Sequence, residues 1–236
     1  MSSADAPGAG RRSIRFARLA AWPRRQPAAA AIAFLCLSIE AILEGADAHL
    51  WGSPAWRGIA FNDGAFWGGL LQGAHPAFPL QPLVMFLSYS LLHGGFWHVA
   101  LNMLTLVSLA PPVTARLGQR RFLTLYLLSA IGGGAGFALF SFTTAPMIGA
   151  SGALFGLAGA ILAWALADRR AIGQSRLEAA RALARPILYL ILLNVVMFWA
   201  MAGGLAWGCH LGGFLTGWAL ALWLDPRRYR FSKMRR

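Results

Sequence analysis

The segment GASGALFGLAGAILAWALA, residues 149–167, indicates the structural class of this protein. Ser151 is its only polar residue, and Asp168-Arg169-Arg170 follows it directly. An apolar run of about 20 residues is long enough to cross a bilayer as an α-helix. A second apolar segment contains His210. Because a polar side chain at membrane depth is costly and marks a candidate functional site, Ser151 and His210 are the first candidates for chemistry.

The composition of the whole chain agrees with a membrane protein. Of its 236 residues, 58% are hydrophobic and 12% are charged, whereas about a quarter of the residues in soluble domains are charged. The net charge of +13 suggests nucleic acid as one alternative partner. However, the basic residues occur in blocks between apolar segments, as they do in cytoplasmic loops of membrane proteins. We therefore expect the lipid bilayer as the surroundings, and no nucleic acid partner.

The apolar segments predict an all-α membrane protein, a bundle of six transmembrane helices. The second predicted span is bounded by Pro82 and by Pro111-Pro112, and the fifth begins after Pro186. Glu40 and Glu44 are expected at the far interface of the first span. The six predicted spans are residues 28–44, 82–109, 121–141, 151–167, 187–202 and 207–224.

The distribution of basic residues predicts the orientation of these spans. Of the 21 Lys and Arg residues, all but Arg57 fall on one side of a six-span arrangement. By the positive-inside rule both termini are then cytoplasmic. The expected organisation is a basic N-terminal tail (1–27), a six-helix membrane domain (28–225) with a long, aromatic-rich outer loop at 45–81, and a basic C-terminal tail (226–236). A signal peptide is the alternative for the N-terminal region, but no convincing cleavage site follows it.

Ser151 is predicted to lie near the N-terminus of the fourth span, where its own backbone N–H has no helical partner and is free to stabilise an oxyanion. Gly149 and Gly152 would let the backbone or a substrate approach closely. His210 opens the sixth span, and Gly213 and Gly217 share its face of the helix. The alternatives are that the glycines serve packing only and that His210 makes one interhelical hydrogen bond.

Further polar residues lie in the second predicted span. His98 and Asn102 are spaced four residues apart, so both project from one face, where their N–H groups would converge on an oxyanion. A metal site formed by His93, His98 and His210 is the rival, but no carboxylate or cysteine joins them. We therefore expect no metal and no cofactor.

Three motifs together resemble the rhomboid family of intramembrane serine proteases over about residues 28–225. They are His93-x4-His98-x3-Asn102, Gly149-Ala150-Ser151-Gly152 and His210-x2-Gly213-x3-Gly217. The resemblance implies that Ser151 is the nucleophile and that His210 is the general base and then the general acid. It implies an oxyanion hole formed by His98, Asn102 and the backbone N–H of Ser151.

The resemblance extends to residues outside the three motifs, with some departures. Trp56-Arg57 resembles a Trp-Arg pair of the family's first outer loop. Phe155 stands where many bacterial members have a tyrosine stacked on the catalytic histidine, and Cys209 stands where alanine is frequent. Thr114 occupies the position of a glutamate common in the family, which puts the usual acid partner of Arg57 in doubt.

The expected function is therefore that of an intramembrane serine endopeptidase that cleaves transmembrane segments of membrane proteins with a Ser151–His210 dyad. The expected location is the bacterial inner membrane, as a multi-pass protein. One alternative is a non-proteolytic rhomboid-like protein that binds transmembrane helices as a chaperone or adaptor. A transporter or channel is a third reading, but the polar groups cluster at one end of the spans rather than along a continuous path.

Overall fold

The computed structural model describes residues 22–140, 144–200 and 205–226. Within these ranges the regular elements are helices, and the one extended pairing is an isolated bridge between Phe66 and Met147. The basic tails predicted from the sequence lie almost entirely outside the described residues. In chain order the elements are α2 (Trp22–Arg25), α3 (Pro27–Asp47), α4 (Ala55–Gly64), η1 (Gly68–Gln72), α5 (Gln81–Ser88), η2 (Tyr89–Leu91), α6 (Phe96–Phe140), α7 (Ser151–Ala171), α8 (Arg176–Ala200) and α9 (Trp207–Leu224).

Three helices of the described part are long and apolar enough to cross a membrane, namely α3, α6 and α7. Many large apolar side chains on the helices remain exposed, among them Phe34 on α3, Leu104 and Leu139 on α6, and Leu188 on α8. Soluble monomers rarely expose apolar surface on this scale, whereas membrane proteins expose it to lipid. The exposed faces therefore agree with the membrane environment that the composition predicts.

The observed α6 helix differs from the second predicted span at both the start and the end of that span. The second span was predicted to start at residue 82, but residues 81–91 form α5 and η2, and α6 begins only at Phe96. Gly95 separates the two with a φ of +110°, a left-handed conformation that glycine adopts most readily. The apolar composition of residues 82–92 resembles that of a span, which is why the pattern did not reveal the break.

The predicted end of the second span at Pro111-Pro112 is also wrong. Both prolines lie inside α6, which continues to a sharp break at Gly118 (φ 76°, ψ 170°). Membrane helices tolerate proline where water or neighbouring groups satisfy the freed carbonyls. A left-handed glycine, in contrast, redirects the chain, so Gly118 rather than the proline pair divides α6 into two legs.

The centre of the molecule is formed by α6, α7 and α9, which pack through glycines. A methyl group at Gly213 of α9 would overlap the carbonyl oxygen of Gly152 on α7, and one at Gly217 would overlap that of Gly156. On the other side of α9, Gly212 meets the backbone of α6 at Gly136. Small residues permit this backbone-to-backbone approach in membrane helices. The glycine contacts thus determine how closely α9 lies to α7 and α6.

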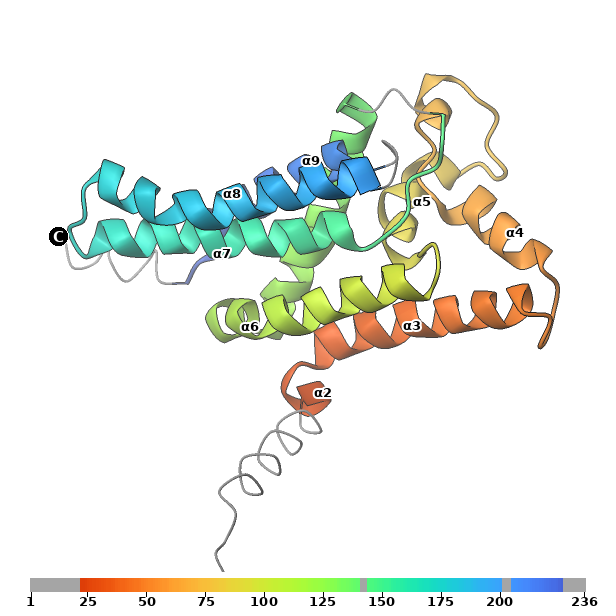
Figure 1. Cartoon of the computed structure of the whole chain (residues 1–236), viewed down its shortest axis with the longest axis horizontal. Helices are drawn as coiled ribbons and strands as arrows, with labels where there is room; N and C mark the ends of the chain where they lie inside the picture. Colours follow the sequence, from red (N-terminus) through yellow and green to blue (C-terminus); the bar gives the residue numbers. More distant parts are fainter. Residues whose placement is uncertain (1–21, 141–143, 201–204, 227–236) are drawn as a thin grey trace, which may run out of the picture.

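The region between α3 and α5 is ordered and packs onto the bundle (Figure 1). Phe66 is fully buried and forms edge-on contacts with Phe86, Tyr89 and Phe137, whose ring centroids lie 4.9, 6.1 and 5.7 Å away. The backbone of Phe66 pairs with Met147, in the loop that leads to α7. This aromatic cluster therefore joins the predicted outer loop to the segment that carries Ser151.

Candidate active site

Ser151 is the first residue of α7, and the turn before it depends on glycine. Gly149 has a φ of +115°, and a Cβ added there would lie 2.8 Å from Nε2 of His98. The N–H of Gly149 donates to the carbonyl of Tyr89 at 2.9 Å, which anchors the turn to η2. Both the conformation and the space at Gly149 thus require glycine, and they bring the ring of His98 next to the start of α7.

His210 lies in the first turn of α9 and meets Ser151 directly. Its Nε2 is 2.9 Å from the Ser151 Oγ, and the histidine is 8% exposed. The close contact of Gly213 with Gly152 holds the first turn of α9 against the first turn of α7. A serine hydroxyl bonded to a buried imidazole is the arrangement by which proteins activate a serine as a nucleophile.

The ring of His210 is also held on its face. Phe155, one turn along α7 from Ser151, stacks on it with centroids 4.2 Å apart and planes 8° apart. Stacking needs the aromatic ring and not a hydroxyl group, so phenylalanine serves here. The plane of the imidazole is thereby held parallel to the ring of Phe155.

A residue that the sequence analysis missed completes the surroundings of His210. Asn194, in the C-terminal half of α8, places its Oδ1 2.6 Å from Nδ1 of the histidine. An amide in the apolar segment Ile191-Leu192-Leu193-Asn194-Val195 is itself a polar group at membrane depth. That signal was available, but nothing in the spacing connects residue 194 to residue 210 or 151.

The two predicted oxyanion donors differ in the structure. The Nε2 of His98 faces Gly149, beside the turn that leads to Ser151, while its Nδ1 accepts the N–H of Gly94 at 3.2 Å. The amide of Asn102, in contrast, donates to the carbonyl of His98 at 2.9 Å. The shared helical face is as predicted, yet Asn102 is engaged with its own helix.

His93 lies behind this cluster and is fully buried. Its ring meets that of His98 edge-on at 5.1 Å, and its Nε2 accepts the N–H of Ala150 at a long 3.5 Å. Within the residues that the structure describes, no three His, Cys, Asp or Glu side chains are grouped so as to bind a metal. His93 and His98 thus form a pair of imidazoles beside the turn that leads to Ser151.

The Trp-Arg pair of the outer region connects α4 to α3. Arg57 pairs with Glu40 at 2.9 Å and with Asp47 at 2.5 Å, and it donates to the carbonyl of His93 at 3.0 Å. Burial lowers the pKa of Arg57, but the hydrogen bonds to Asp47 and Glu40 outweigh this effect and raise its pKa above the ordinary value. The acid partners of Arg57 thus come from α3.

The residue at the family's glutamate position lies elsewhere. Thr114 donates to the side chain of Gln26 at 2.7 Å, in a contact between α6 and the residue just before α3. Trp56, beside Arg57, is 40% exposed. Arg57 therefore has acidic partners in the C-terminal part of α3, whereas Thr114 lies at the other end of that helix.

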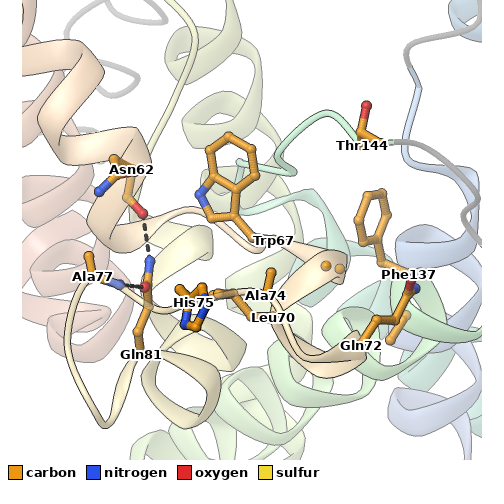
Figure 2. Close-up of a pocket in the computed structure, with 13 residues that line it drawn as sticks. Asn62, Trp67, Leu70, Gln72, Ala74, His75, Ala77, Gln81, Phe137 and Thr144 are labelled. Atoms are coloured by element: carbon orange, nitrogen blue, oxygen red, sulfur yellow. Dashed lines mark hydrogen bonds between the residues drawn. The ribbon is translucent and has the colours of Figure 1, made fainter.

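A cavity of about 390 Å³ opens in the outer region, between η1, α5 and the end of α6. Figure 2 shows Trp67, His75 and Gln81 around it, with Gln81 bonded to the carbonyl of Asn62 and to the N–H of Ala77. Neither Ser151 nor His210 lines this cavity. It is a separate feature of the loop and adds no group to the serine–histidine pair.

The chain is also similar to known proteins over the segment that contains Ser151 and His210. The family model described as the rhomboid domain matches residues 81–227. The chain is 36% identical over 143 residues to the rhomboid protease GluP of Bacillus subtilis, a match covering 60% of this chain and 26% of GluP. It is 34% identical over 144 residues to the protein YdcA of the same bacterium, covering 59% of this chain and 66% of YdcA. RHOMBOID-like protein 5 of Arabidopsis thaliana is 36% identical over 134 residues, covering 55% of this chain and 40% of that protein.

Proposed function

Because this chain belongs to the rhomboid family, we propose that it is an intramembrane serine endopeptidase with Ser151 as nucleophile and His210 as general base. It is a multi-pass membrane protein, and its substrates are transmembrane segments of other membrane proteins. One observation carries the proposal, the 2.9 Å contact between the Ser151 Oγ and the His210 Nε2. A pair at this distance transfers a proton without rearrangement.

The reaction follows from this geometry. His210 Nε2 takes the proton of the Ser151 hydroxyl as Oγ attacks the carbonyl carbon of the scissile peptide. When the tetrahedral intermediate collapses, the C–N bond breaks and the imidazolium returns its proton to the leaving amine. Water, deprotonated by the same imidazole, then hydrolyses the acyl-enzyme and restores the serine.

Three donors are proposed to stabilise the oxyanion. The backbone N–H of Ser151 is free because it opens α7, and the N-terminus of a helix favours negative charge. His98 supplies Nε2 from beside Gly149. Asn102 donates one of its two amide N–H groups to the carbonyl of His98, and the second N–H is the one that would join them. The supporting roles are proposed as follows. Close approach of the backbones is permitted by the glycines Gly149, Gly152, Gly213 and Gly217. Phe155 holds the ring of His210, and Trp56-Arg57 stabilises the outer region.

The proposal of six transmembrane spans depends on the division of α6 into two parts at Gly118. The break at Gly118 leaves two legs of about 22 residues each, and at 1.5 Å per residue each leg is about 33 Å long, enough to span a bilayer. With α3, α7, α8 and α9 this makes six crossings. The positive-inside pattern then puts both termini in the cytoplasm of a bacterial cell, with the 1–27 and 226–236 tails flanking the membrane domain and the 45–81 loop outside.

Cleavage by the purified protein in liposomes is the direct test. The substrate is a model single-span protein, assayed beside Ser151→Ala and His210→Ala. Ser108→Ala and His75→Ala are matched controls, because both lie outside the proposed site, one on α6 and the other in the outer loop. We expect both site variants to lose cleavage and both controls to keep it.

The result that overturns the proposal is product formation by Ser151→Ala equal to that of the unaltered protein. A second adverse result is a protein that neither cleaves nor reacts with a fluorophosphonate at Ser151 but still binds the substrate helix. That result would favour the non-proteolytic rhomboid-like binder.

A further inference from the structure

We propose that Asn194 is a positioning residue that selects the tautomer of His210, so that the site works as a Ser151–His210–Asn194 triad. The inference rests on the proposed function, because it concerns the base of that reaction. Its starting point is the 2.6 Å contact between Asn194 Oδ1 and His210 Nδ1, which joins α8 to α9.

The orientation of the Asn194 amide is determined by a second bond. Its Nδ2 donates to the carbonyl of Leu190, one turn earlier on α8, at 2.8 Å. The reversed amide would place two oxygens against each other there and would lose this bond. Oδ1 therefore faces the histidine, and because a carbonyl oxygen only accepts, His210 Nδ1 must carry the proton.

The consequence reaches the other ring nitrogen. In a neutral imidazole with a proton on Nδ1, Nε2 has a free lone pair. That lone pair points at the Ser151 hydroxyl at 2.9 Å, so the serine is the donor of this bond. The opposite tautomer would present N–H to Ser151 and would have no capacity to take its proton.

Phe155 does not supply the same selection. Its ring lies flat against the imidazole, and stacking of this kind holds the plane of the ring with little regard to which nitrogen is protonated. Asn194 acts in the plane of the ring, at a nitrogen. The two contacts are thus complementary, since one holds the plane and the other selects the proton position.

An amide is also the side chain that the location favours. A carboxylate at this nitrogen would attract the imidazolium more strongly, but a charge at membrane depth is expensive. Asn194 lies in an apolar part of α8, where its neighbour Val195 is 47% exposed. The amide orients the base without adding a charge.

The test combines kinetics with a direct measurement of the tautomer. The variants are Asn194→Ala, which removes the acceptor, and Asn194→Asp, which keeps it. Val195→Ala, an exposed neighbour on the same helix, is the control. We expect Asn194→Ala to lower kcat about 10- to 100-fold, part of what a general base contributes, with KM little changed. Val195→Ala should behave like the unaltered protein.

Asn194→Asp should rescue much of this loss at high pH. The aspartate stabilises the imidazolium, so the acid limb of its kcat/KM profile should move to higher pH than in the unaltered protein. A residue with a merely structural role would not move this limb.

The tautomer is measured in the unaltered protein by nitrogen NMR with labelled histidine, the His210 signal being assigned through His210→Ala. We expect the proton on Nδ1, and a mixture of tautomers in Asn194→Ala. This reading needs no substrate and no activity. A proton on Nε2 in the unaltered protein overturns the inference even if the variants fail to fold, and so does an unchanged kcat and pH profile in Asn194→Ala. If the protein cleaves nothing and a fluorophosphonate leaves Ser151 unlabelled, the proposed protease activity fails instead.

Discussion

Each of the groups around Ser151 is held by a different kind of contact. His210 is bonded at both ring nitrogens and stacked on one face, whereas His98 rests against a turn that only glycine can form. Asn102 is tied to the backbone of its own helix. The catalytic contribution of a residue in this site should therefore depend on how its existing contacts direct the groups that remain available to the substrate.

This difference predicts unequal effects for the two oxyanion candidates. His98→Ala should lower kcat roughly 100- to 1000-fold, the usual cost of losing one oxyanion donor. Asn102→Ala should cost less, because one N–H of its amide is held by the carbonyl of His98, which limits the directions in which the second N–H can donate. Single-turnover cleavage by the two variants measures both. Equal losses, or a larger loss for Asn102→Ala, would contradict the prediction.

At the scale of the helices, the site is built by the approach of α9 to α7. Gly213 contacts the backbone of Gly152, and Gly217 contacts that of Gly156, so the two helices meet without side chains between them. The rotation of α9 that points His210 at Ser151 follows from this contact. The packing of α7 on α9 thus also determines the geometry of the Ser151–His210 pair.

Adding a single methyl group at this contact should therefore affect both stability and activity. Gly213→Ala would overlap the carbonyl of Gly152, and overpacking of this kind costs about 1–3 kcal/mol. We expect a lower Tm and a kcat reduced at least tenfold, since Ser151 and His210 would separate. Gly58→Ala on α4, where a Cβ meets nothing within 4 Å, is the matched control. Normal cleavage by Gly213→Ala would show that the glycine contact does not control the pair.

Over the whole molecule, two arginines join helices at separate places. Arg57 links α3 and α4 to the segment before α6, close to the site residues His93 and His98. Arg116 bonds Asp168 at 2.6 Å and Asp225 at 2.5 Å while lying over the ring of Trp164 at 4.9 Å. The second arginine therefore fastens α6 to the ends of α7 and α9 that are remote from Ser151.

Replacing Arg116 should separate stability from catalysis. Arg116→Ala removes two ion pairs at once, and because Asp225 is only 8% exposed, the loss of its bond to Arg116 should be destabilising. We expect Tm to fall by several degrees, at roughly 2–4 °C per kcal/mol for a chain of this size, with kcat unchanged well below Tm. Arg120→Ala, an exposed arginine on the same helix, should change neither quantity. Loss of kcat at low temperature in Arg116→Ala would refute the separation.

Local spacing made parts of the site predictable. The i, i+4 relation puts His98 and Asn102 on one helical face, and the three motifs identified the rhomboid family, which the family match confirms. Helix boundaries were harder to predict, because an apolar run such as residues 82–92 has the same composition in a short helix as in a transmembrane span. Gly95 and Gly118 end or redirect helices through left-handed conformations that the letter G alone does not reveal.

The class of the protein followed from the sequence, since apolar length and the placement of charge act along the chain and need no knowledge of packing. The tertiary structure was required for the bond of Asn194 to His210, the acidic partners of Arg57 on α3, and the unequal engagement of His98 and Asn102. Each of these depends on how far one helix is rotated about its axis and how closely it approaches the next. At the centre of the bundle, glycine contacts between α6, α7 and α9 set those quantities, and residues distant in sequence meet only after the helices have packed.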